Sequence, residues 1–372
     1  MPRTALVIPD KFKGTLTAQK AAQAIARGWS RACPSDRLEL LPMSDGGDGF
    51  GPILSAAIGA SASSARTTDA AGRPCRAQWW RESRRRIAIV ESARVIGLAM
   101  LPPGRYHPFQ LDTSGLGRLL DSIRERAIRT CLIGIGGSAT NDGGFGVARA
   151  LGWQFLDRHG HQIERWPDLV LLHKLVPPIR RLDLEMIVAT DVRNQLLGSR
   201  GASRVYGPQK GLRNQDQGIA ENALRQLATV TRDHLGTNHA DRPGAGAAGG
   251  LGFGLMAFLD ARPEPGFEVF ARYARLDDHL DRAGIVITGE GAVDASSLMG
   301  KGVGEIAGRC RIRGIPCVAL GGITNDLARV RKAFSHVAAL TDCTTSADAM
   351  RRPSHWLSRL SEQVARTLKA SR

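Results

Sequence analysis

The sequence predicts an α/β protein, and three observations support that fold class. Short apolar runs recur along the chain, a glycine-rich or acidic turn follows most of them, and helical patterns lie between several of them. The apolar runs are residues 5–8, 38–41, 87–90, 131–135, 186–189, 285–288 and 317–320. Runs of this length without polar alternation are typical of parallel strands that are buried on both faces. We therefore expect parallel sheets covered by helices.

Three helices stand out between and after these strands. Thr17 is a suitable N-cap for a helix whose apolar residues reach Trp29, and residues 5–41 then form one βαβ unit. Asp216 is expected to cap a second helix, with Ile219 and Leu227 on its buried face. Residues 356–368 form a closing amphipathic helix.

The composition is that of a globular protein with two or three domains. The chain has 372 residues, of which 42% are hydrophobic and 23% charged, and its 43 glycines gather in short clusters. The net charge of +16 is spread along the chain, and the densest basic run, residues 84–86, contains no aromatic residue that could stack on a base. We therefore expect no specific nucleic-acid partner.

The six cysteines are far apart and form no CxxC pair, which fits a reducing compartment. The chain begins with a short strand pattern instead of a signal peptide, and no apolar run approaches the ~20 residues that span a bilayer. We expect a cytoplasmic protein with no membrane partner.

The first strand is followed by a turn that suits a polyphosphate. Asp10, Lys11, Lys13 and Gly14 precede a helix, and lysine charge, free helical N–H groups and glycine are what such a ligand needs. The turn is not a Walker A loop, because GxxxxGK[ST] is absent. The alternative is a turn whose lysines are simply in water.

Two further turns place carboxylates among glycines, which suits Mg²⁺. Residues 42–49 contain Asp45 and Asp48, and residues 288–294 contain Glu290 and Asp294. Lys301 follows the second of these turns in a Gly-Lys-Gly sequence ahead of a helix. The alternative for residues 42–49 is a flexible Asp-Gly turn.

Residues 134–144 form the most informative turn, because they combine glycines with many polar groups after a strand and before a helix. The residues with hydrogen-bonding or backbone roles are Gly136, Gly137, Ser138, Thr140, Asn141 and Asp142. They suit a small hydroxy acid or a phosphate. Asp191 ends another strand, where a carboxylate could accept a proton or bind a metal.

Other chemistries have little support. The glycine run at residues 244–252 has a loose GxGxxG spacing but no preceding strand, and a close-packed helix start explains it nearly as well as nucleotide contact. The histidines have no zinc spacing, and no GxSxG motif is present.

The ordered set of turns resembles the type I (bacterial) glycerate kinase family over nearly the whole chain. The matching segments are residues 8–14, 42–49, 136–144, 191–194, 201–211, 244–252 and 289–301. The resemblance implies two α/β domains, one flavodoxin-like and built from both chain ends, the other inserted in the middle. Composition sets the limits of the first domain near residues 1–75 and 280–372, and of the second near 76–279.

The resemblance also implies the reaction. The γ-phosphoryl group of ATP would move to a hydroxyl of D-glycerate with Mg²⁺ present; 2-phosphoglycerate is the favoured product and 3-phosphoglycerate the other. The alternative function is a regulatory protein that binds phosphate or a sugar acid without kinase activity. Oligomeric state is not predicted.

Hypothetical roles follow for the matching residues. Lys13 neutralises the transferring phosphoryl group, Asp191 is the base with Asp294 as the second choice, and Asp45 and Glu290 hold Mg²⁺. The remaining candidates would bind substrate or nucleotide: Asp10, Gly14, Gly136, Gly137, Ser138, Thr140, Asn141, Asp142 and Lys301. The chain departs from the family pattern at Lys11, Arg193, Gln195 and Ser296.

Overall fold

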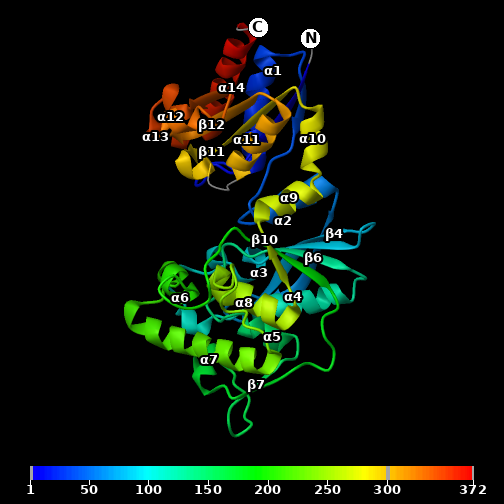
Figure 1. Ribbon diagram of the computed structural model, residues 1–372, viewed down its shortest axis with the longest axis vertical. Coiled ribbons are helices and arrows are strands. Elements are labelled where there is room, and N and C mark those ends of the chain that lie inside the picture. The colour runs from blue at the N-terminus through cyan, green and yellow to red at the C-terminus, as the bar shows by residue number, and fades with distance from the viewer. Residues whose placement is uncertain (1–2, 299–301, 371–372) are drawn as a thin grey trace. The chain divides into compact units, whose positions relative to one another are not determined.

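A computed structural model of the chain describes residues 3–298 and 302–370 (Figure 1). The chain forms two compact units, which we call unit 1 and unit 2. Unit 1 contains Met1–Asp45, Pro52–Ala57 and Phe270–Arg372, and unit 2 contains Gly46–Gly51 and Ile58–Val269. Two helices, α2 (Phe50–Ile58) and α9 (Gly266–Tyr273), include residues of both units. The limits predicted near residues 75 and 280 rest on composition alone and stay a prediction.

Unit 1 is built on a five-stranded sheet with the order β13-β12-β11-β1-β2, in which every pair is parallel. Its strands are β1 (Thr4–Pro9), β2 (Arg37–Leu40), β11 (Ile285–Val293), β12 (Cys317–Thr324) and β13 (His336–Ala339). Renumbered within the unit, this order is the 2-1-3-4-5 order of the flavodoxin fold. The predicted flavodoxin-like domain from both chain ends is therefore confirmed.

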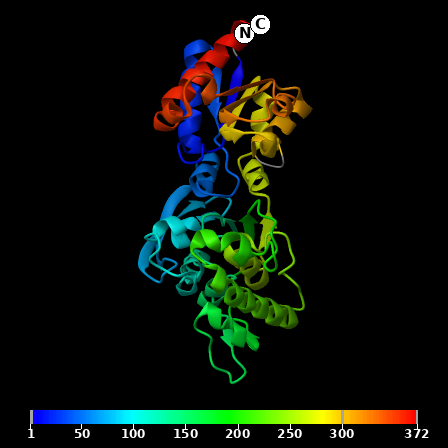
Figure 2. The same cartoon turned by 90° about the vertical axis from the view of Figure 1, so that its left-hand side faces the viewer.

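The helices of unit 1 form as their apolar periodicity predicts. Thr17 caps α1, with its hydroxyl accepting a hydrogen bond from the Lys20 amide at 3.3 Å, and Trp29 is fully buried in the core. The α-helices of this unit are α1 (Ala18–Ala32), α10 (Leu276–Arg282), α11 (Gly302–Arg313), α12 (Leu327–Val330), α13 (Ser346–Arg351) and α14 (Pro353–Ala370). In both views α14 lies beside α1 (Figures 1 and 2).

Unit 2 is built on a six-stranded mixed sheet with the order β10-β9-β6-β5-β4-β3. The strands are β3 (Ser61–Thr68), β4 (Pro74–Glu82), β5 (Ile87–Glu91), β6 (Thr130–Gly134), β9 (Glu185–Ala189) and β10 (Arg262–Glu264). From β5 to β10 the neighbours are parallel, whereas β3 and β4 pair antiparallel. The predicted inserted α/β domain is confirmed, with a sheet that is mixed.

The hairpin of β3 and β4 and a small two-stranded sheet were not expected from the sequence. β3 is an edge strand with the sequence SASSARTT, so it lacks the apolar run by which the other strands are recognised. The small sheet pairs β7 (Gln154–Leu156) with β8 (Lys174–Val176).

The helices of unit 2 are α3 (Ala93–Ile96), α4 (Ser114–Arg124), α5 (Phe145–Ala150), α6 (Ala202–Tyr206), α7 (Gln217–Leu235) and α8 (Ala247–Leu259). The predicted cap of α7 is wrong in its detail. The Asp216 side chain makes no capping hydrogen bond and instead accepts hydrogen bonds from Arg213 and pairs with His107. Ile219 is 48% exposed, because the buried face of α7 runs through Ala220 and Leu224.

Strand register brings the candidate loops to the carboxyl ends of the sheets. In unit 1, Pro9 at the end of β1 pairs with Gly289 of β11. In unit 2, Glu91, Gly134 and Ala189 end β5, β6 and β9 side by side. Ligands of parallel α/β sheets bind beyond these ends. Within the described part of the chain, no helix has the length and apolar character needed to cross a membrane.

Candidate active site

Asp10 lies at the centre of an acidic group in unit 1. Its amide donates to the Gly289 carbonyl at 2.8 Å, and one carboxylate oxygen accepts the Lys11 amide at 2.7 Å. Burial and the nearby carboxylates of Asp45 and Glu290 raise the pKa of Asp10 to about 7. The loops after β1 and β2 and the carboxyl-terminal half of β11 therefore bring three predicted carboxylates close enough to interact.

Lys11, one of the departures from the family pattern, takes part in this group. Its ammonium nitrogen lies 3.5 Å from a carboxylate oxygen of Asp45, and both side chains are about one-third exposed. An ion pair with this much exposure contributes roughly 0–1 kcal/mol to stability. Its main effect is to place a positive charge beside Asp45.

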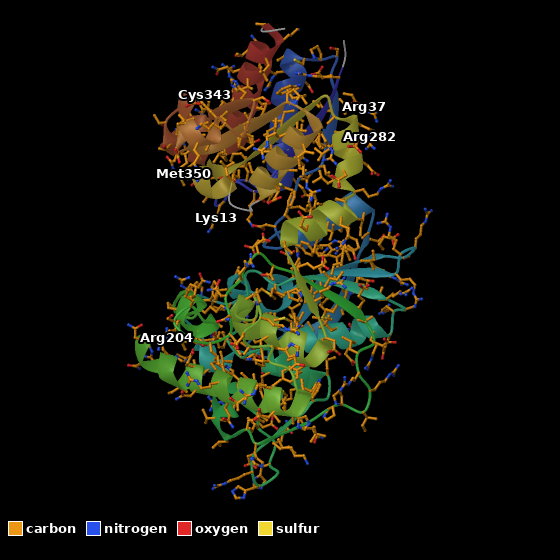
Figure 3. The ribbon with its side chains drawn as sticks, viewed as in Figure 1. Lys13, Arg37, Arg204, Arg282, Cys343 and Met350 are labelled. Atoms are coloured by element: carbon orange, nitrogen blue, oxygen red, sulfur yellow. The ribbon has the colours of Figure 1, made fainter. Side chains whose placement is uncertain are left out.

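Lys13 projects from the tight turn between β1 and α1, where Figure 3 labels it, and it is exposed. The Phe12 amide donates to the Leu16 carbonyl at 2.9 Å and closes the turn. Gly14 has φ +80°, a conformation that glycine adopts without strain. The turn therefore holds an exposed lysine next to the acidic group, because the Lys13 backbone lies beside Gly291 of β11.

Asp294 follows β11 and starts the short helix η6 (Ala295–Leu298). Its carboxylate accepts the amides of Ser296 and Ser297 at 2.7 and 3.3 Å, so Ser296, another departure, contributes only its backbone to this contact. Lys301 lies outside the described residues. Among residues 3–298 and 302–370, no group of three or more His, Cys, Asp or Glu side chains is arranged as a metal site.

In unit 2 the segment of residues 46–49 crosses the carboxyl ends of β6 and β9. Gly46 has φ +87°, and a Cβ added there would lie 2.8 Å from the Ala189 carbonyl oxygen. A Cβ on Gly137 would lie 2.6 Å from a carboxylate oxygen of Asp48. The Gly49 amide donates to the buried Glu91 carboxylate at 2.8 Å. Two glycine-rich motifs that are distant in sequence thus lie in direct contact.

The polar side chains of residues 138–142 point into the protein. Ser138 donates to the Ala248 carbonyl at 3.1 Å, and the Asn141 amide nitrogen donates to the Ser203 hydroxyl at 2.9 Å. Thr140 and Asn141 are fully buried, and neither the Thr140 hydroxyl nor the Asn141 carbonyl oxygen has a hydrogen-bond partner among the described residues. Only Gly136 and Gly137 of this loop have appreciable exposure, so they present backbone to solvent.

Asp142 stabilises the same loop through hydrogen bonds. One carboxylate oxygen accepts the Thr113 amide and hydroxyl and the Gly146 amide at 2.8–3.0 Å, and the other accepts the Gly144 amide at 3.2 Å. The side chain is fully buried, and burial raises its pKa, with Asp112 adding to the effect. The Asp142 carboxylate therefore accepts its hydrogen bonds from Thr113 and from the backbone at the start of α5.

Asp191, two residues after the end of β9, is exposed, in contrast to Asp142. One of its carboxylate oxygens accepts the Gly266 amide at 2.8 Å, at the first residue of α9. Arg193, a departure from the family pattern, is exposed, and the Gln195 side chain donates to the Asp241 carbonyl at 3.1 Å. This loop therefore combines an anchored carboxylate with an added positive charge.

Lys210 lies in the family-matching segment of residues 201–211, and the sequence alone assigns it no role. Its side chain is buried, and its ammonium nitrogen donates to the Ser138 hydroxyl at 3.0 Å and to the Thr140 carbonyl at 2.6 Å. Removal from water lowers the pKa of Lys210 to about 7, although the Asp142 carboxylate opposes that change. A lysine before a glycine in this turn gave no signal of burial, because lysine is rarely buried.

This pKa predicts a pH-dependent stability. The folded value of about 7 lies below the ordinary value of 10.5, so the unfolded chain binds more protons above pH 7 and stability rises with pH. The unfolding free energy of native protein minus that of Lys210→Met should therefore increase by about 2 kcal/mol between pH 7 and pH 9. Urea titrations followed by the fluorescence of the tryptophans measure this difference.

The exposed Lys20 gives the matched control. The difference between native protein and Lys20→Met is expected to stay constant over the same pH range, because this side chain lies on the exposed face of α1. A Lys210→Met difference that is equally flat would contradict the assignment of a buried, largely neutral lysine.

Comparison with known proteins links these loops to one family. The model of the glycerate kinase family matches residues 5–369. A glycerate kinase of Halalkalibacterium halodurans is 36% identical over 86% of this chain and 85% of its own length. The glycerate 2-kinase of Escherichia coli is 33% identical over 98% of this chain and 97% of its own length. A crystal structure of a candidate glycerate kinase 2 from Salmonella typhimurium LT2 superposes with a TM-score of 0.87 at 31% identity, covering 100% of this chain and 99% of that chain.

Proposed function

The chain belongs to the glycerate kinase family and is an ATP-dependent phosphotransferase, and from this premise we propose that it phosphorylates the 2-hydroxyl of D-glycerate. The observation that carries the site assignment is the group of Asp10, Asp45 and Glu290 beside the turn that bears Lys13. Acidic oxygens for a metal and a lysine for phosphate are the parts that phosphoryl transfer needs. 

Lys13 is proposed to contact the phosphates of ATP. The transition state of phosphoryl transfer is loose and carries charge on its equatorial oxygens, so positioned positive charge lowers its energy. Lys13 is exposed on a turn fixed by backbone hydrogen bonds, and Gly14 leaves the backbone open beside it. Asp10 and Lys301 are proposed to bind substrate or nucleotide alongside it.

Mg²⁺ is proposed to be held by Asp45 and Glu290. The donor set fits, because Mg²⁺ takes oxygen ligands, keeps several waters and needs only one or two carboxylates when phosphates complete its shell. Burial is the main cause of the raised pKa of Asp10, and the nearby carboxylates of Asp45 and Glu290 add to it, which supports this assignment. When bound, Mg²⁺ would neutralise charge on the β- and γ-phosphates.

The unit 2 loops are proposed to act on the acceptor. Asp191 is the choice for the group that orients or deprotonates the attacking hydroxyl, because it is exposed and anchored by the Gly266 amide. Asp294 stays the second choice. The backbone of Gly136 and Gly137 is proposed to contact the glycerate carboxylate, whereas Ser138, Thr140, Asn141 and Asp142 hold this loop in place from inside.

The choice of the 2-hydroxyl rests on one relative. The Escherichia coli protein, which this chain matches over 98% of its length, is named glycerate 2-kinase. A cytoplasmic location is proposed on the six free thiols, since glutathione keeps cytosolic cysteines reduced.

Coupled measurement of ADP release tests the activity. With ATP and Mg²⁺, D-glycerate is expected to give rapid ADP release, and L-glycerate, glycolate and hydroxypyruvate much less. NMR of the product is expected to show phosphorus coupled to the proton on carbon 2. Coupling to the carbon 3 protons would correct the regiochemistry, and binding of D-glycerate without ADP release would favour the regulatory alternative.

A further inference from the structure

Helices α1 and α14 approach each other closely in unit 1, and both views show them side by side (Figures 1 and 2). A Cβ added to Gly28 would lie 2.0 Å from the Ser358 carbonyl oxygen and 2.9 Å from the Glu362 amide nitrogen. Only glycine permits this contact between backbones. Longer side chains of both helices lie around this contact at the surface.

These side chains line an open surface hollow of about 600 Å³. Its lining is basic: Arg27, Arg31, His355 and Arg359 surround it, with Ser354 and Ser358 between them. Glu362 is the one acidic residue in the lining.

The charge of this hollow is poorly balanced by protein groups. Glu362 pairs with Arg31 at 3.0 Å and also with Arg366, so it offers little to the other arginines. Arg27 is oriented by a neutral group, because it donates to the Ser354 hydroxyl at 2.7 Å. Arg359 makes no hydrogen bond or ion pair with another described residue.

Two other arginine pairs in unit 1 are compensated by acids. Arg309 and Arg313 pair with Asp277 at 3.2 and 2.7 Å, and Arg351 and Arg352 both contact Asp348. An arginine-rich composition therefore explains why arginines are common on the surface. It does not explain a hollow in which arginines contact serine hydroxyls instead of carboxylates. A seryl oxygen fixes a guanidinium without cancelling its charge.

We propose that this hollow binds a small molecule that carries a phosphoryl group. Guanidinium groups donate paired hydrogen bonds that match phosphate oxygens, and the serine hydroxyls supply further donors. The ligand would add the negative charge that the lining lacks. This site goes beyond the proposed kinase function and does not depend on it.

The hollow is separate from the candidate active-site residues of unit 1. Asp10, Lys13 and Gly14 precede α1, and Asp45 and Glu290 lie near Asp10, whereas Arg27 and Arg31 lie in the last two turns of α1. At 1.5 Å per residue, the nine residues from Ala18 to Arg27 span about 14 Å of helix. A phosphate in the hollow therefore would not occupy the turn that bears Lys13.

Calorimetric titration of the full-length protein tests the site. Saturating Mg²⁺ and D-glycerate are present throughout, and nucleotide is left out because its own phosphates would compete for the hollow. Inorganic phosphate and phenyl phosphate are then titrated separately, to distinguish a free phosphate from a phosphate ester. Native protein is expected to bind one of them once per chain, and Arg27→Gln with Arg359→Gln should weaken that binding at least about tenfold.

The control is Lys20→Gln with Arg37→Gln, which removes the same charge from exposed positions of unit 1 outside the hollow; Figure 3 labels Arg37. It should bind phosphate within twofold of native protein. Equal weakening in both double variants would mean attraction by net charge alone and would overturn the proposal. So would unchanged affinity in the arginine variant, or no phosphate binding by native protein.

Discussion

Asp191→Asn is expected to lower kcat with D-glycerate at least about 10²-fold while the protein folds normally. A positioned base contributes typically about 10²–10⁴-fold, and the loose transition state of phosphoryl transfer places this case at the lower end. Asparagine keeps an oxygen that can accept the Gly266 amide, so the start of α9 keeps its anchor. The substitution therefore removes the negative charge and the proton acceptor but not the local structure. Steady-state ADP release measures the effect.

Asp183→Asn is the matched control. Asp183 is exposed and lies just before the amino end of β9, the strand whose carboxyl end precedes Asp191. It should turn over at the native rate. If Asp191→Asn also keeps the native rate, Asp191 is not the base, and Asp294 becomes the candidate to test.

Lys13→Ala is expected to lower kcat/KM for ATP about 10²–10³-fold, the usual effect of removing one electrostatic contact to a transition state. The side chain is exposed and its turn is closed by backbone hydrogen bonds, so truncation should leave the fold intact. Initial rates at varied ATP concentration measure it.

Lys20→Ala serves as the control for Lys13, since it removes an exposed lysine from the first turn of the helix that follows. Native ATP kinetics are expected for this variant. Unaltered ATP kinetics in Lys13→Ala itself would remove Lys13 from the phosphate site.

The fold could be predicted where strands are buried on both faces. Five of the predicted apolar runs form strands, and they begin at Ala5, Ile87, Cys131, Ile285 and Cys317. A short apolar run without polar alternation is typical of a strand that is buried on both faces. The polar edge strand β3 gave no such signal. Local sequence also could not reveal that the Asp216 side chain would pair with His107, which is 109 residues away.

The candidate site shows a similar division. The glycine, acidic and lysine residues that follow the strands predicted the candidate loops. Strand register explains why Asp10 lies near Glu290. Neither the motifs nor the strand register could show which side chains point into the protein. The ligand-binding roles of Asn141 and Asp142 stay predictions, and their contacts with Ser203 and Thr113 depend on distant segments. The burial of Lys210 depends on packing in the same way.

Hydrogen–deuterium exchange of the full-length protein tests the central claim that the strand-end loops are the ligand-binding loops. A non-hydrolysable ATP analogue with Mg²⁺ is expected to slow amide exchange in residues 10–16 and 289–294. D-glycerate is expected to slow exchange in residues 134–144 and 190–194. Saturating ligands that leave all four segments unchanged while protecting other parts of the chain would contradict this account.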